Sequence, residues 1–246
     1  APATLQLDGS SYELPVVTGT DGQRAIDVSR LKEETDLFVY DSTLNNTAVT
    51  QSSITCIDTA SGKLLYRGYD VEDLVREASY VEVAYLLTNG ELPSAAEYET
   101  FSRTLANHSM IHESMRNFFQ AFPGDAHPLA ILATMVTALS SYYPQTYEEH
   151  KEAGIDVKAR LLAKVRTLAA WSYIKAIGHP VIYPRDEVPY AHNLLMMMFA
   201  VPAEPYSVDE YDAQVLNKFF ILYSDHEQNS ATSTVRFVSS TRANLF

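Results

Sequence analysis

The chain has 246 residues, of which 46% are hydrophobic, and a formal net charge of −13. This length and composition can bury a sizeable core as one large domain or two small ones, and they exclude a disordered protein. The acidic balance of 31 Asp and Glu against 18 Lys and Arg excludes nucleic acid as an expected partner, because phosphate backbones would be repelled.

The cellular compartment can be judged from the cysteine and from the apolar runs. A single cysteine, Cys56, excludes an intrachain disulfide framework and fits a reducing compartment. The most apolar run, LAILATMVTAL, is far shorter than the ~20 residues that span a bilayer. The first residues lack the basic and apolar regions of a secretion signal. We therefore expect a cytoplasmic protein with no membrane partner.

Short runs of alternating polarity fill the first part of the chain, residues 1–70. They are separated by the turn-forming stretches DGSS, GTDGQ and TASG, so the pattern predicts small strands in hairpins. The runs are TLQL, YELPVV, SSITCID and KLLYRG.

From Val71 onward, residues 71–246 have the spacing of helices. Asn89 and Gly90 predict the end of one helix, because glycine readily adopts the left-handed conformation of a C-cap. Two later helix starts carry the Ser-x-x-Glu pattern of a capping box, at Ser94 and at Ser207.

Pro128 opens the run PLAILATMVTALSSYY, which is apolar on every face until its end. Proline suits the first helical position, and a helix that is apolar all round predicts burial on every side. Its expected neighbours are helices over residues 156–177, 190–200 and 208–224. No repeat and no convincing domain boundary interrupts this part of the chain.

A polar stretch follows the last of these helices, from Asp225 to Thr234, and only Ala231 within it is apolar. If the helix continued, His226, Asn229, Ser230 and Ser233 would share one face. If it ends at Ser224, the same residues form a loop. Composition favours the loop, because Ser, Thr, Asn and Asp prefer caps and turns.

Histidines are the main candidates for chemistry. His108 and His112 are four residues apart, a spacing that on one helix could hold a metal. A zincin would place a glutamate between them, whereas Glu113 follows both, so we expect a helix end or surface pair and no metal. His127 is expected beside a helix N-terminus. The sequence contains no G-x-S-x-G elbow and no glycine-rich phosphate loop.

A resemblance to a known family extends this reading. The stretch SDHEQNSATSTVR followed by SSTRANLF resembles citrate synthase of the bacterial type, and similar stretches occur in the same order from about Ser52. They are SSITCID, LLYRGYDVEDL, EVAYLLTNGELP, HSMIHE, FPGDAHPLAIL, ARLLAKV, GHPVIYPRD, NLLMMMF and PAEPYSVD. The resemblance implies a mainly α-helical fold in which residues 71–246 form an incomplete large domain, after a small β-rich region, without the family's small domain.

The resemblance also implies a function. Enzymes of this family condense oxaloacetate with acetyl-CoA, a co-substrate, at the entry to the tricarboxylic acid cycle, and they are homodimers or assemblies of dimers. The family's first oxaloacetate-binding histidine falls on His226, whose imidazole can donate to a ketone or carboxylate oxygen. Asp225 and Glu227 would favour the charged imidazole if they lie close to it.

No catalytic residue can be assigned within this chain, because the family's catalytic histidine and aspartate and its carboxylate-binding arginines lie after the position that matches Phe246. General acid and base catalysis needs such a pair. We therefore expect the N-terminal part of a citrate synthase that is inactive alone. Two positions near His226 also depart from the family, since Tyr223 replaces histidine and Ala231 replaces serine.

In the NADH-inhibited subset of the family, a regulatory nucleotide pocket falls on His108, Tyr143, Arg160 and Lys164. Asn107 stands where that pocket has an arginine, and one cation fewer should weaken binding. The alternative for Arg160 and Lys164 is a basic face along one helix, which we favour.

Three alternatives remain open at this point. The first is 2-methylcitrate synthase, which uses propionyl-CoA. The second is a non-catalytic helical module derived from the same fold that dimerises or binds a small ligand. The third is a metal-binding helical protein that uses His108 and His112.

Overall fold

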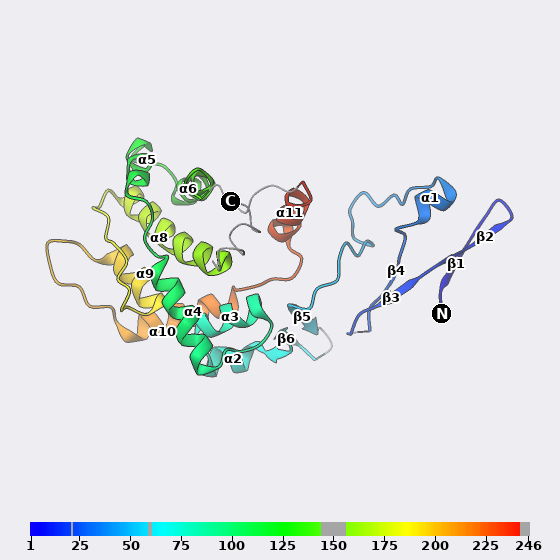
Figure 1. Cartoon of the computed structure of the whole chain (residues 1–246), viewed down its shortest axis with the longest axis horizontal. Helices are drawn as coiled ribbons and strands as arrows, with labels where there is room; N and C mark the ends of the chain where they lie inside the picture. Colours follow the sequence, from blue (N-terminus) through cyan, green and yellow to red (C-terminus); the bar gives the residue numbers. More distant parts are fainter. Residues whose placement is uncertain (21, 59–60, 144–155, 242–246) are drawn as a thin grey trace.

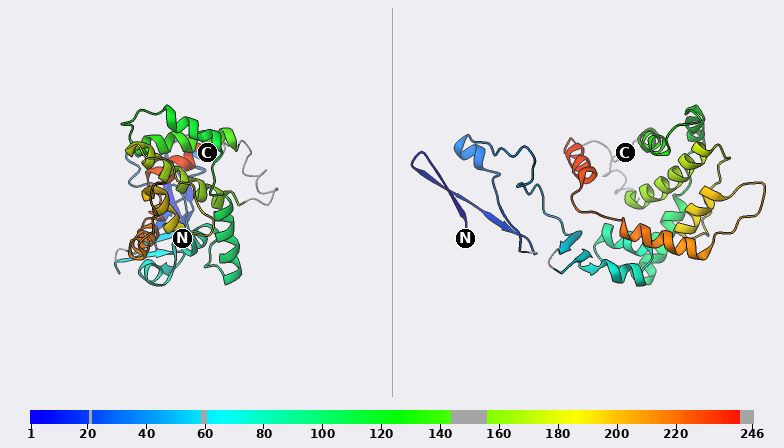
Figure 2. Two further views of the ribbon diagram at one scale, coloured as in Figure 1. Left: turned by 90° about the vertical axis from the view of Figure 1, so that its left-hand side faces the viewer. Right: turned by 180° about the vertical axis from the view of Figure 1, so that it is seen from behind.

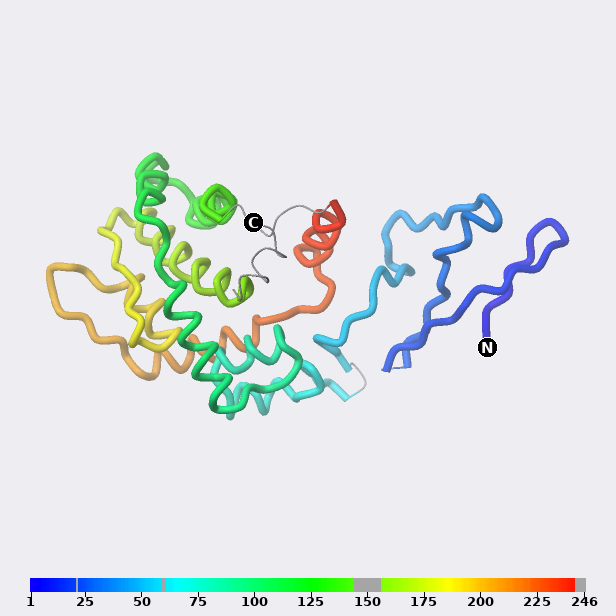
Figure 3. Tube along the Cα trace, viewed as in Figure 1, coloured from blue at the N-terminus to red at the C-terminus, as the bar shows by residue number. Residues whose placement is uncertain are grey.

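The structure is a computed structural model that describes residues 1–20, 22–58, 61–143 and 156–241. The N-terminal part holds two small antiparallel hairpins and a short helix (Figure 1). Their elements are β1 (Ala3–Leu7), β2 (Ser10–Leu14), β3 (Val16–Thr18), β4 (Arg24–Ile26) and α1 (Leu31–Thr35). The hairpins lie away from the main helical body, and residues 36–54 connect the two parts (Figure 3).

A second β element joins this arm to the helices. It is a three-stranded antiparallel sheet of β5 (Thr55–Asp58), β6 (Lys63–Tyr66) and β7 (Tyr69–Asp70). All four runs predicted as strands contain strands, because each alternates polar and apolar residues between turn-forming stretches. Tyr66 faces inward and is completely buried, which attaches the sheet to the helical body.

Helices make up the rest of the described chain, as the sequence predicts. Their bounds are α2 (Val71–Glu77), α3 (Tyr80–Asn89), α4 (Ala95–Asn107), the 3-10 turn η1 (Glu113–Met115), α5 (Arg116–Ala121), α6 (Pro128–Tyr142), α8 (Val157–Ile177), α9 (Tyr190–Phe199), α10 (Glu210–Leu222) and α11 (Ser230–Ser239). Seen from the side and from behind, they form one body from which the N-terminal arm extends (Figure 2). No helix in the described ranges is long and apolar enough to cross a bilayer.

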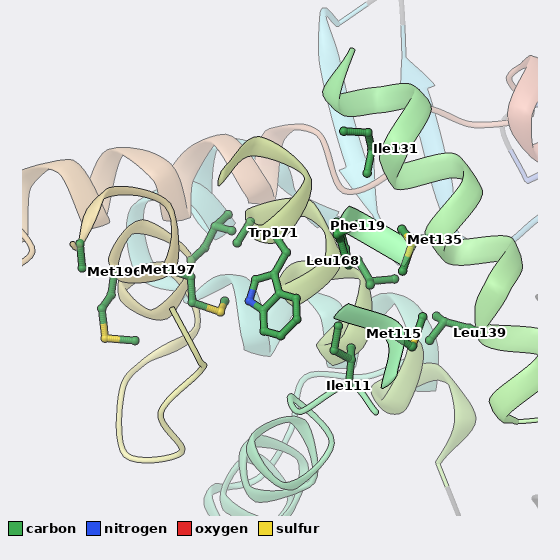
Figure 4. Packing of buried hydrophobic residues seen from close by; sticks show 13 residues of the cluster. Ile111, Met115, Phe119, Ile131, Met135, Leu139, Leu168, Trp171, Met196 and Met197 are labelled. Atoms are coloured by element: carbon green, nitrogen blue, oxygen red, sulfur yellow. The ribbon is translucent and has the colours of Figure 1, made fainter. Parts of the chain in front are cut away.

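The centre of this body is α8, which packs against α4, α5, α6 and α9. Trp171 lies in the middle of the core, between methionines of α9 and residues of α5 and α6 (Figure 4). Its indole N–H donates to the carbonyl of Ile182 at 2.9 Å, so the polar atom of this buried ring is satisfied. The helix therefore both organises the core and anchors the connection that follows it.

The prediction that α6 is buried on every side is wrong. Only Ile131, Met135 and Leu139 are fully buried, at steps of four along one face. Leu129, on another face, is 67% exposed. The reason is that α6 lies at the edge of the body with α8 as its main packing partner among the described helices.

Local end signals decide most helix boundaries. Gly90 ends α3 in the left-handed conformation, and Ser94 forms the predicted capping box with Glu97. The predicted box at Ser207 is wrong. Asp209 is the N-cap of α10 and accepts from the backbone N–H of Tyr211 at 2.8 Å, so the helix begins too late for the serine to reach its first turn.

Candidate functional site

The polar stretch is a loop followed by a new helix. Helix α10 ends at Leu222, two residues earlier than predicted, and α11 begins at Ser230 after the N-cap Asn229. The amide oxygen of Asn229 accepts from the backbone N–H of Thr232 at 2.9 Å. The preference of Asn and Ser for caps and turns stops the first helix. The prediction of a loop is therefore correct for residues 225–229 and wrong from Ser230 onward, where α11 begins.

This loop is held by the β5–β6 hairpin. The Asp225 carboxylate accepts from the Thr55 hydroxyl at 2.5 Å, and the Glu227 carboxylate accepts from the backbone N–H of Ile57 at 3.2 Å. The hydroxyl of buried Tyr66 donates to the carbonyl of Asp225 at 3.1 Å. The residues on either side of His226 are thus tied to a strand that lies far away in the sequence.

The two acidic neighbours of His226 therefore have a role that the sequence did not indicate. Asp225 also accepts from the backbone N–H of Glu227 at 2.9 Å, and Glu227 adopts a left-handed backbone with φ of 52°. Both carboxylates are used to shape the loop. The His226 side chain is exposed, and it makes no hydrogen bond within the part of the chain that the structure describes. It is presented to solvent on a restrained loop.

Part of the polar stretch lines a cavity of about 940 Å³. One wall is formed by Glu227, Gln228, Ser233 and Thr234, and the other by residues of the segment 44–55. The arginine of α11, Arg236, reaches across to the carbonyl of Val49 at 3.4 Å. Of the residues expected to share one polar face, Ser233 lines this cavity, whereas His226, Asn229 and Ser230 are not among its lining residues.

His108 and His112 do not form a pair on one helix. Helix α4 ends at Asn107, with His108 as its C-cap. His112 is the N-cap of η1, where its Nδ1 accepts from the backbone N–H of Ser114 at 3.2 Å. The metal spacing is therefore broken by a turn. Across the described residues, no three His, Cys, Asp or Glu side chains gather as metal ligands. His127 is an N-cap, as expected near a helix start.

The four residues of the expected regulatory pocket lie together. Lys164 Nζ donates to the carbonyls of His108 at 3.3 Å and Met110 at 2.7 Å. The same ammonium lies 4.7 Å from the centroid of the Tyr143 ring, and the Arg160 guanidinium lies 5.2 Å from it. Two cations from successive turns of α8 thus flank one aromatic face.

Arg160 and Lys164 are buried, with exposures of 8% and 3%. The two side chains do share one face of α8, as the favoured prediction of a basic face has it, but that face is buried and not on the surface. Burial, with the charge of Arg160 beside it, lowers the pKa of Lys164 from 10.5 to about 8. Burial and the two positive charges lower the pKa of His108 as well. The carboxylate of Asp156 opposes this shift of the His108 pKa, and it does so less strongly than burial and the two cations.

Most of the chain matches the sequence model of one family. The sequence model described as citrate synthase, C-terminal domain, matches residues 43–246. The chain belongs to the citrate synthase family. The matched segment contains the loop with His226 and all the helices from α2 to α11.

Solved citrate synthases share this fold. The enzyme from Pyrobaculum aerophilum is 27% identical with a TM-score of 0.72, and the match covers 94% of this chain and 54% of that one. The enzyme from Thermotoga maritima MSB8 is 26% identical with a TM-score of 0.69, covering 84% and 52%. This chain spans about half the length of these proteins.

A third solved citrate synthase is that of Thermoplasma acidophilum, in a ternary complex with carboxymethyl coenzyme A and oxaloacetate. It is 24% identical with a TM-score of 0.75, and the match covers 82% of this chain and 52% of that one. At this identity the match shows the fold alone. The expected mainly helical citrate synthase fold is therefore confirmed.

Sequence reasoning missed the residues that restrain the loop, Thr55 and Tyr66. Thr55 is separated from Asp225 by 170 positions, so no local pattern connects them. Within the run SSITCID, Thr55 is one of several polar residues, so its position in the strand does not single it out.

Proposed function

We propose that this chain is the part of a citrate synthase that carries the first oxaloacetate-binding histidine, His226. The reaction condenses oxaloacetate with acetyl-CoA to give citrate and CoA. Acetyl-CoA acts as a co-substrate, and no further cofactor is proposed. The family's catalytic groups match no residue of this chain, so we expect the 246 residues alone to bind oxaloacetate without turnover. We further propose a cytoplasmic protein whose complete form is a homodimer or an assembly of dimers.

The single observation that carries this proposal is the restrained, exposed His226 within a chain of this family. The dicarboxylate oxaloacetate needs a hydrogen-bond donor of neutral or positive character, and an imidazole can supply one. The anchors on Asp225 and Glu227 limit the motion of the loop, which lowers the entropy lost when a ligand is bound. Membership of the citrate synthase family supports oxaloacetate and acetyl-CoA as the substrates.

Calorimetric titration of the purified chain with oxaloacetate tests the proposal. We expect His226→Ala to weaken binding by about tenfold or more, since a hydrogen bond to a charged group is lost. His179→Ala is the matched control, because His179 is also an exposed loop histidine and lies just after α8. Equal affinity in the wild type and in His226→Ala would remove His226 from the site.

The acyl donor requires a separate assay. The described residues are equally compatible with propionyl-CoA, the substrate of 2-methylcitrate synthase. CoA release by the complete protein, measured with each thioester at matched concentrations, identifies the substrate. A lack of release with both, from a monodisperse protein, would favour the alternative of a non-catalytic module.

We also propose that His108, Tyr143, Arg160 and Lys164 form a regulatory site for an anionic nucleotide such as NADH. The proximity of two buried cations to one aromatic ring supports it. Asn107 is not cationic, so weak binding is expected. Fluorescence titration with NADH, comparing the wild type with Lys164→Met, tests this site, and an unchanged titration in the variant would refute it.

A further inference from the structure

A second cavity, of about 730 Å³, lies where α2, α3, α4, α9 and α10 meet. These helices lie side by side in the lower part of the helical body (Figure 1). The lining of this cavity includes the first turns of α10, whereas His226 follows the last turn of the same helix. The volume is within the range of about 300–1,000 Å³ that is usual for small-molecule sites. The cavity is therefore a separate place at which a ligand could bind.

Arg166 of α8 lines this cavity, although only 5% of its surface is exposed. Its Nη2 donates to the hydroxyl of Ser109 at 2.6 Å, and its Nη1 to the carbonyl of Tyr190 at 3.5 Å. The guanidinium also lies 4.4 Å from the centroid of the Tyr190 ring. All these groups are uncharged, so the positive charge is buried without an opposite charge in contact.

The hydrogen-bonding capacity of Arg166 is not filled. Among the described residues its Nε has no hydrogen-bond partner, and neither has the hydroxyl of Ser102, which lines the same cavity. The ion pairs found in the described ranges of the chain do not include Arg166. Burial lowers the pKa of the guanidinium, and the nearby ring of Tyr190 and carboxylate of Asp186 only partly oppose this. A buried charge of this kind is stabilised when an anion reaches it.

The remainder of the lining limits which anion can enter. Carboxylates outnumber Lys and Arg side chains around the cavity, and Glu77, Asp186 and Glu187 belong to no ion pair in the described residues. Their negative charges repel phosphates and dicarboxylates more strongly than a single carboxylate. Apolar side chains such as Val75 and Leu105 offer a surface for a hydrocarbon portion.

We propose that this cavity binds a small aliphatic monocarboxylate, with the carboxylate on Arg166 and the hydrocarbon portion against the apolar wall. Nothing in the citrate synthase reaction requires such a site. It is independent of the oxaloacetate loop and therefore stands or falls separately from the proposed function.

Calorimetric titration of the whole chain with butyrate is the first test, with succinate and inorganic phosphate as comparators. The measurements use the His226→Ala background, so that binding to the oxaloacetate loop does not contribute. We expect butyrate to bind at least about tenfold more tightly than either comparator. No binding of butyrate, or equal or tighter binding of succinate or phosphate, would overturn the proposal.

Variants locate the site. Arg166→Met should weaken butyrate binding by about tenfold to a hundredfold, because the charged partner is lost. Arg103→Met, which removes an exposed cation of α4, is the matched control and should leave the affinity unchanged. If Arg166→Met fails to fold, Ala106→Leu fills the cavity and keeps the guanidinium, and it should block binding. Unchanged affinity in a folded Arg166→Met or in Ala106→Leu would place any binding elsewhere.

Asp186→Asn supplies a change in the opposite direction. Asp186 is exposed, so its substitution leaves the core intact. Removing its competing negative charge should tighten butyrate binding several-fold at low salt. Unchanged or weaker binding would contradict the electrostatic basis of the site.

Discussion

The buried ammonium of Lys164 should give the protein a distinct dependence of stability on pH. The pKa of Lys164 is 10.5 in an unperturbed chain and about 8 in the folded protein, because burial and Arg160 disfavour the charged form. Between these two pH values the unfolded chain keeps a proton that the folded chain has released. By linkage, the free energy of unfolding therefore rises as pH increases from about 8 toward 10.5.

The size of this effect follows from the pKa difference. A shift from 10.5 to about 8 corresponds to at most about 3 kcal/mol over the whole window. The carbonyls of His108 and Met110 still solvate the ammonium, so we expect about half of this value. Tyrosines with raised pKa values, such as Tyr143, change the pH dependence of stability only above about pH 10. The useful interval is therefore pH 7.5 to about 9.5.

Urea unfolding of the wild type and Lys164→Met tests the prediction. The fluorescence of Trp171 reports unfolding, because it is the single tryptophan and is fully buried. Lys164→Met removes a buried charge, which stabilises the protein, and leaves two carbonyls without a donor, which destabilises it. The slope of the free energy of unfolding against pH is therefore more informative than its absolute value. We expect the wild type to gain about 0.5 kcal/mol more per pH unit than the variant.

The control is Lys218→Met, which removes an exposed lysine of α10. Its pH slope should match that of the wild type. Slopes for the wild type and Lys164→Met that agree within about 0.2 kcal/mol per pH unit would refute the inference that the pKa of Lys164 is lowered in the folded protein. A shallower slope in Lys218→Met as well would show that the effect is not specific to the buried site.

Two further predictions concern a helix start and the His226 loop. Asp209→Ala should destabilise the protein by about 1 kcal/mol, because the N-cap of α10 is lost, whereas Ser207→Ala should change stability by less than about 0.5 kcal/mol. Chemical denaturation of both variants checks this, and the reverse order would show that the serine is the cap. Tyr66→Phe should lower stability by about 1 kcal/mol, because its hydroxyl no longer donates to the carbonyls of Leu222 and Asp225. Hydrogen exchange should also become faster in residues 223–229, and unchanged exchange there would mean that Tyr66 does not restrain the loop.

The sequence alone determined the features whose causes are local. Gly90 ends a helix because it tolerates a left-handed backbone. Ser94 starts a helix because its side chain accepts a hydrogen bond from a free backbone N–H of the first turn. Pro128 suits the first helical position because it has no backbone N–H that would need a partner. The loop around His226 follows from the preference of polar residues for turns. Even a local signal was misread at Ser207, where Asp209 offered a competing cap two residues later.

Only the tertiary structure decided which faces are buried and which distant groups meet. The apolar character of α6 could not show that one of its sides is exposed among the described residues, and the spacing of Arg160 and Lys164 could not show that both side chains are buried. The contact between Thr55 and Asp225 joins residues 170 positions apart. Burial and long-range pairing depend on the packing of whole elements, which periodicity within one element does not contain. For that reason the sequence located His226, while the structure revealed the strand that holds its loop.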